Sequence, residues 1–138
     1  MRLSKAYIDS NVFFYAKIRD RTFGDSCLRV MQQIASGELK ASISALVPIE
    51  VANAMRKYGL RKEIPDEVRA IFSLGIDVYP IGEPEAREAA EIFKKVDINP
   101  YDCLHAAVMK NNALGEIVSA DKEFDKLDWL KRRDPRSF

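Results

Sequence analysis

Short apolar runs alternate along the chain with segments whose hydrophobic residues recur every three or four positions. The first pattern predicts buried strands and the second predicts helices with one inward face. Gly37 and Gly59 are suitable helix stops, and Asn99-Pro100 is a typical helix start. The predicted strands cover residues 6–8, 40–43, 76–81, 117–119 and 129–133, and the predicted helices cover about 27–36, 44–59, 65–72, 83–96 and 99–114.

Several local details follow from the same pattern. Residues 9–11 (Asp-Ser-Asn) predict a turn after the first strand, and a short helical turn is expected near Phe124. Ser44 is a candidate cap for the helix that follows it, where Pro48 is tolerated in the first turn. In the segment 83–96, the predicted inward residues are Ala86, Ala89, Ala90 and Phe93.

Strands that alternate with helices predict an α/β fold with a mostly parallel central sheet of four to five strands. The chain has 138 residues and shows no internal repeat or Pro/Gly/Ser-rich linker, so we expect a single domain over residues 1–138. In such sheets, ligands bind beyond the carboxyl ends of the strands.

Composition narrows the class of protein. Hydrophobic residues make up 47% and charged residues 31%, which is typical of a globular protein, and no apolar run is long enough for a membrane span. The net charge is +1, so any nucleic-acid contact must come from local basic clusters. Cys27 and Cys103 lie in apolar surroundings and are expected to be reduced core thiols in a cytoplasmic protein.

Four acidic residues stand alone in apolar sequence near the predicted element ends: Asp9, Glu50, Asp102 and Asp121. A buried carboxylate is costly unless it is paired, neutralised or bound to a metal. Helix or turn capping explains Asp9, Asp102 or Asp121 singly, and a salt bridge explains Glu50, but a shared site explains all four. Carboxylate oxygens favour a hard cation, Mg²⁺ or Mn²⁺.

Other polar residues are secondary candidates. Asn11 and Ser119 are close in sequence to two of the acids and can orient their carboxylates, and Asp125 can add an outer ligand. His105 stands three residues after Asp102, which fits either a metal ligand pair or a hydrogen-bonded, partly buried histidine. The sequence contains no nucleophile elbow, phosphate-binding glycine loop or dinucleotide fingerprint.

The order of these acids resembles the PIN-domain family, above all the VapC-type toxins of toxin–antitoxin pairs. The matching segments cover nearly the whole chain: YIDSNV at 7–12, IEV at 49–51, PYDCLHAA at 100–107, VSADKEFD at 118–125 and RDP at 133–135. Many relatives carry Thr or Gly before the fourth acid, where this chain has Ser119-Ala120.

The resemblance implies a three-layer α/β/α fold and a divalent-metal site in which Asp9, Glu50, Asp102 and Asp121 are catalytic metal ligands. It also implies hydrolysis of RNA phosphodiester bonds, a cognate antitoxin and a homodimer. Two rival hypotheses stay open: a non-catalytic or RNA-processing PIN-domain binding module, and a metal-dependent phosphohydrolase that acts on DNA or a small phosphate ester.

Overall fold

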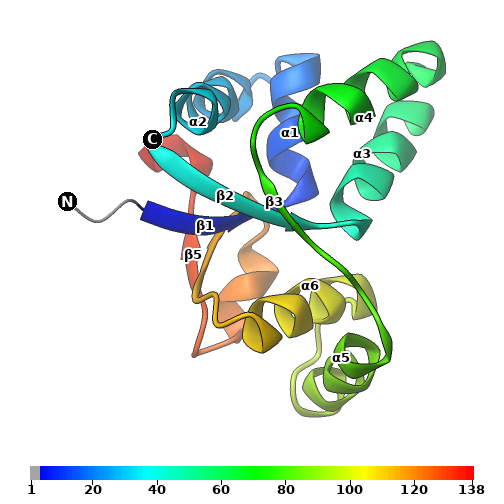
Figure 1. Cartoon of the computed structure of the whole chain (residues 1–138), viewed down its shortest axis with the longest axis vertical. Helices are drawn as coiled ribbons and strands as arrows, with labels where there is room; N and C mark the ends of the chain where they lie inside the picture. The colour runs from blue at the N-terminus through cyan, green and yellow to red at the C-terminus, as the bar shows by residue number, and fades with distance from the viewer. Residues whose placement is uncertain (1–3) are drawn as a thin grey trace.

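A parallel five-stranded sheet organises the computed structural model, which describes residues 4–138 (Figure 1). The strand order is β3-β2-β1-β4-β5, and every pairing of neighbours is parallel. The strands are β1 (Ser4–Ile8), β2 (Leu39–Ser44), β3 (Asp77–Tyr79), β4 (Glu116–Val118) and β5 (Lys131–Arg133).

Helices cover both faces of this sheet, which gives the three layers that were predicted (Figure 1). One layer contains α1 (Ser10–Ile18), α2 (Gly24–Ser36), α3 (Leu46–Lys57) and α4 (Ile64–Phe72), and the other contains α5 (Glu83–Lys95) and α6 (Pro100–Asn111). Three short 3₁₀ helices complete the described part of the chain: η1 (Arg61–Glu63), η2 (Lys122–Lys126) and η3 (Pro135–Ser137).

The core is centred on β1. Ala6, Tyr7 and Ile8 are all fully buried, because helices cover both sides of the central strand. The chain runs from β1 to β2 and β3 on one side and then returns to β4 on the other side. The carboxyl ends of β1 and β4 therefore lie at the topological switch point, where open α/β sheets bind ligands.

Most predicted elements are present. Gly37 ends α2 with a left-handed φ of 84°, and the Asn99 side chain caps α6 by accepting a hydrogen bond from the Tyr101 N–H at 2.8 Å. Cys27 and Cys103 are free and buried, as expected. Among residues 4–138, no helix is both long and apolar enough to span a bilayer.

Three local predictions were wrong. Residues 9–11 do not form a turn; Asp9 is the N-cap of α1, a helix that the sequence pattern did not reveal. Ser44 does not cap α3, since it is the last residue of β2 and its hydroxyl accepts a hydrogen bond from Tyr7.

The inward face of α5 was also assigned wrongly. Its buried residue is Ile92, whereas Phe93 is 49% exposed and Ala86 and Ala90 are exposed. The helix packs mainly against α6 at the outside of its layer, so only a narrow stripe of its surface is covered. Residues 1–3 of the predicted domain lie outside the described residues.

Candidate metal centre

Asp9 is placed by the end of the central strand. The residue follows β1 directly and is only 5% exposed. As the N-cap of α1, it accepts a hydrogen bond at Oδ1 from the Ser10 N–H at 2.8 Å. The end of a buried strand and the start of a helix thus fix one carboxylate at the switch point of the sheet.

The second oxygen of Asp9 is held by one residue that follows β4 and by one residue of α1. Asp9 Oδ2 accepts hydrogen bonds from Ser119 Oγ at 2.6 Å and from Asn11 Nδ2 at 3.0 Å. The other end of the Asn11 amide accepts a bond from the Ala120 N–H at 3.2 Å. Asn11 and Ser119, two predicted orienting residues, therefore contact Asp9 directly and connect α1 to the segment after β4.

Glu50 approaches from α3 and contacts the only histidine in the chain. Its Oε1 lies 2.5 Å from Nε2 of His105, which is fully buried in α6. Potential ligand atoms of Asp9, Glu50 and His105 all lie within 4.8 Å of one another. The structure thus brings together residues separated by 41 and 55 positions, on three different elements.

Asp102 belongs to the same electrostatic cluster. The residue lies in the first turn of α6, and burial raises its pKa to about 7. The negative charges of Asp9, Asp121 and Glu50 contribute to this upward shift, while His105 opposes it. A carboxyl group that is hard to ionise beside other carboxylates is a suitable place for a cation.

Burial also raises the pKa of Asp9, although the charge of His105 and the hydrogen bond from Ser119 partly compensate. For His105, burial lowers the pKa, but the hydrogen bond to Glu50 and the charges of Glu50, Asp9 and Asp102 outweigh it, so the net shift is upward. The pKa values of Asp9, Asp102 and His105 are thus all raised, and the charge of Glu50 contributes to each shift.

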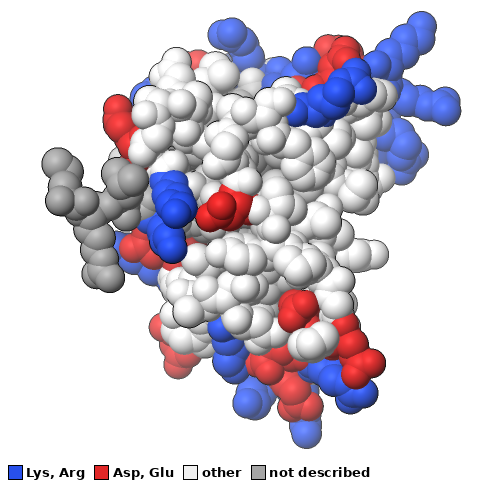
Figure 2. All heavy atoms as spheres, in the orientation of Figure 1, with Lys and Arg blue, Asp and Glu red and all other residues white. Residues whose placement is uncertain are grey.

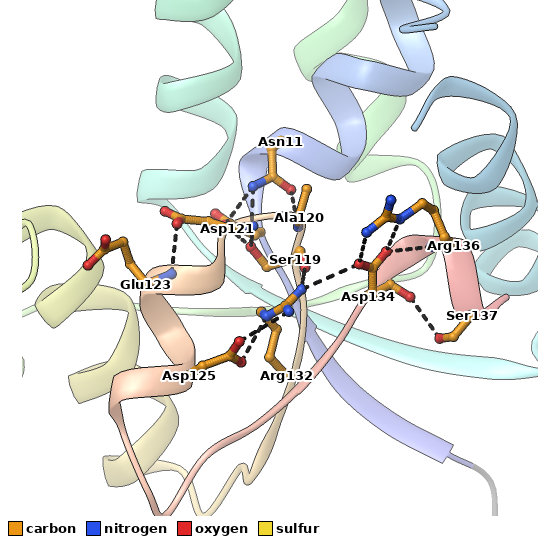
Figure 3. A network of polar contacts seen from close by, with 11 residues as sticks. Asn11, Ser119, Ala120, Asp121, Glu123, Asp125, Arg132, Asp134, Arg136 and Ser137 are labelled. Atoms are coloured by element: carbon orange, nitrogen blue, oxygen red, sulfur yellow. Dashed lines mark hydrogen bonds and ion pairs between the residues drawn. The ribbon is translucent and has the colours of Figure 1, made fainter. Parts of the chain in front are cut away.

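Asp121 lies after β4 and caps η2, where its Oδ1 accepts a hydrogen bond from the Glu123 N–H at 3.0 Å (Figure 3). Its backbone N–H donates to Ser119 Oγ at 3.0 Å, so the same serine contacts both Asp9 and Asp121. The capping role that the sequence allowed is therefore real, and it coexists with a position close enough to raise the pKa of Asp102.

Asp125, the predicted outer ligand, does not contact any of the four acids directly in the part of the chain that the structure describes. It forms an ion pair with Arg132, whose Nε lies 2.9 Å from Asp125 Oδ1, and its side chain is 53% exposed (Figure 3). Arg132 Nη1 also donates to the Ser119 carbonyl at 2.9 Å. The contacts of Asp125 therefore reach the site only through the backbone of Ser119.

The donor set fits a hard divalent cation. Asp9 and Glu50 offer carboxylate oxygens within 4.8 Å of each other, and Asp102 interacts electrostatically with both and with Asp121. Mg²⁺ and Mn²⁺ favour carboxylate oxygen. Asp9, Glu50, Asp102 and Asp121 are the residues that could hold such an ion. Tyr7 contacts both His105 and Ser44, and no motif in the sequence could have revealed either Tyr7 or Ser44.

A parallel α/β sheet with acidic residues gathered at its carboxyl edge defines a known class of domain. The family model described as PIN domain matches residues 6–130. The chain belongs to the PIN domain family.

The chain is similar in sequence to a VapC ribonuclease and in fold to solved toxin structures. Ribonuclease VapC13 of Mycobacterium tuberculosis is 24% identical over 126 residues, which cover 91% of this chain and 96% of that protein. The crystal structure of M. tuberculosis VapC20, described as a sarcin-ricin loop cleaving toxin, superposes with a TM-score of 0.74 at 14% identity and covers 88% of this chain and 93% of that one. A toxin–antitoxin complex from Klebsiella pneumoniae superposes with a TM-score of 0.66 at 15% identity and covers 94% and 97%.

Proposed function

We propose that this chain is a metal-dependent endoribonuclease and the toxin of a type II toxin–antitoxin pair. The observation that carries the proposal is the acidic cluster at one edge of the sheet. Asp9 and Glu50 offer ligand atoms within 4.8 Å of each other, and the charges of Asp9, Asp121 and Glu50 act on Asp102, which with burial raises its pKa to about 7. Membership of the PIN family and the name of the relative Ribonuclease VapC13 support it.

The four carboxylates would hold Mg²⁺ or Mn²⁺. When bound, such an ion lowers the pKa of a water molecule and stabilises the charge that develops on a phosphodiester. The other residues of the site hold the carboxylate ligands in position. Ser10, Asn11 and Ser119 hold both oxygens of Asp9, and His105 holds one oxygen of Glu50.

A cleft leads from Glu50 toward positively charged side chains. It has a volume of about 550 Å³ and includes Glu50, Asn53 and Lys57, which follow one face of α3. Exposed Lys and Arg side chains project from the end of the molecule where α3 and α4 lie (Figure 2). This arrangement suits a polyanion whose scissile phosphate reaches the metal while its backbone contacts the basic residues.

The proposed class of toxin ribonuclease also implies binding partners and a cellular location. A cognate antitoxin, a homodimer and a cytoplasmic location are part of this proposal, as is a single functional domain over residues 1–138. The similar toxin–antitoxin complex from Klebsiella pneumoniae supports the antitoxin.

The test is cleavage of a mixed RNA pool by the purified protein with Mg²⁺, Mn²⁺ or EDTA. We expect cleavage with either metal, none in EDTA, and a loss of more than about 100-fold in Asp9→Asn, because removing even an outer partner of a ligand costs 10–100-fold. Asp125→Asn is the matched control, since it makes the same chemical change in an aspartate paired with Arg132. Equal cleavage by Asp9→Asn and the wild type would contradict the proposal, and cleavage of DNA but not RNA would favour a different phosphohydrolase.

A further inference from the structure

The contact between Glu50 and His105 continues through two more side chains. His105 Nδ1 lies 2.6 Å from the Tyr7 hydroxyl, and this hydroxyl lies 2.8 Å from Ser44 Oγ. Ser44, Tyr7 and His105 are all fully buried. A continuous line of hydrogen bonds therefore runs from β2 through β1 and α6 to Oε1 of Glu50 on α3.

The imidazole ring has little freedom to change this arrangement. The rings of Tyr7 and His105 meet edge to face, with centroids 5.5 Å apart and planes at 60°. Since both rings are fully buried in a close-packed interior, rotation of either one would require its neighbours to move. The positions of both ring nitrogens of His105 are thus set by the fold.

A proton must lie between His105 Nε2 and Glu50 Oε1, whichever way the hydroxyl groups point. If Tyr7 donates to Ser44, its oxygen accepts from Nδ1–H, and the 2.5 Å contact at Nε2 needs a further proton because two bare acceptors repel each other. If Tyr7 donates to Nδ1 instead, the neutral ring carries its proton on Nε2 and donates it to Glu50. In both arrangements Oε1 is engaged by the imidazole.

We propose that His105 is a positioning residue for Glu50: the line from Ser44 through Tyr7 and His105 holds Oε1 and leaves Oε2 as the oxygen that Glu50 offers to the cation. The proposal deepens the function above and rests on its metal centre. Asp9, Glu50 and His105 are close enough for the imidazole itself to be a ligand. A ligating nitrogen needs a free lone pair, however, and the contact with Glu50 occupies the one on Nε2.

The first test uses the fact that His105 is the only histidine. In protein labelled with ¹⁵N-histidine, every histidine nitrogen signal belongs to this ring, so NMR reports the proton on Nε2 without a mutation. We expect Nε2 to share a proton with Glu50 in metal-free protein and to keep this contact when Mg²⁺ is added. An Nε2 that loses its proton and shifts as a metal-bound nitrogen would overturn the proposal.

The second test measures Mg²⁺ binding by calorimetry in variants. Tyr7→Phe keeps the ring and removes the hydroxyl, and His105→Leu removes the donor to Glu50. We expect each to weaken Mg²⁺ binding about 10–100-fold, the usual cost of losing an outer partner of a metal ligand. His105→Gln, which retains an N–H group, should recover part of the loss.

Val108→Ala is the control, because Val108 is buried in the same helix and offers no hydrogen bond to the acids. Its Mg²⁺ affinity should equal that of the wild type even if its stability falls. Wild-type affinity in folded Tyr7→Phe and His105→Leu would overturn the proposal. Both tests use Mg²⁺ and no RNA, so a protein that binds Mg²⁺ in this way but cleaves no RNA would contradict the proposed function and leave the role of His105 intact.

Discussion

Two regions of the molecule hold aspartates in opposite surroundings: the ion pairs around Asp134 and the acidic cluster around Asp102. Asp134 accepts hydrogen bonds from Arg136 at 3.1 and 2.8 Å, and these bonds hold its pKa at about 2 (Figure 3). Asp102 is partly buried instead, and burial together with the charges of Asp9 and Asp121 raises its pKa to about 7. The same side chain is therefore favoured as an anion in one region and disfavoured in the other.

The difference indicates which region is built for structure and which for chemistry. Arg132, Asp134 and Arg136 form a network of ion pairs, so their charges compensate one another within the fold. In the acidic cluster, folding brings like charges together at a cost in stability. Such a cost is expected where a ligand supplies the missing positive charge.

Ser119→Ala should produce the largest change among the substitutions that test the two regions, and the change is in Mn²⁺ affinity. The substitution removes the 2.6 Å hydrogen bond to Asp9 Oδ2 and the acceptor of the Asp121 N–H. We expect Mn²⁺ affinity to fall about 10–100-fold, because an outer partner orients the ligand. Ser26→Ala, another buried serine, should leave Mn²⁺ affinity unchanged in the same calorimetric titration. Equal affinities in the two variants would show that Ser119 does not orient the site.

The pH dependence of stability should separate the two regions. Asp102 has an ordinary pKa of 3.8 when unfolded and about 7 when folded, so it opposes folding increasingly as pH rises from about 4 to 7. Asp134 acts in the opposite direction: it stabilises the fold above its ordinary pKa of 3.8, and this contribution is lost as pH falls toward 2.

Urea unfolding in EDTA at pH 5 and pH 8 measures the effect of Asp102. We expect the metal-free wild type to lose on the order of 2 kcal/mol relative to Asp102→Asn between these values, after allowance for solvent screening. If the wild type and the variant change in parallel with pH, folding does not raise the pKa of Asp102.

The smallest effect should come from Asp125→Asn. This substitution removes a partly exposed ion pair with Arg132, and the loss of a surface pair costs about 0.2–1 kcal/mol in typical proteins. Mn²⁺ affinity should stay at the wild-type value, because Asp125 contacts the site only through Arg132 and the Ser119 backbone. A fall in affinity of 10-fold or more would restore Asp125 to the metal centre as an outer ligand.

The sequence contained enough information to predict the acids but not how their neighbours hold them. Asp9 and Asp121 follow apolar strands, and parallel strands present their carboxyl ends at one edge, so the convergence of these residues was predictable. Glu50 was recognisable as a charge in an apolar helix. Each of these signals is local, and the parallel sheet turns local signals into spatial proximity.

The line from Ser44 to His105 could not be predicted, because it depends on packing between distant elements. Tyr7 and His105 are 98 positions apart, and an apolar strand gives no sign that its tyrosine needs a polar partner. Ser44 resembled a helix cap, since a serine before a helix usually has that role. For α5, the apolar stripe did not reveal that Phe93 lies on the outer side, because periodicity does not say which side a neighbour covers.

The most direct test of the metal centre is the melting temperature at pH 8 with and without saturating Mn²⁺, in the wild type, Asp9→Asn and Asp125→Asn. At 100 times the dissociation constant, a single bound ion adds about 2.7 kcal/mol, which corresponds to a rise of several degrees. We predict this rise in the wild type and Asp125→Asn, and its loss in Asp9→Asn. An equal rise in all three proteins would place the bound metal elsewhere and contradict the central claim.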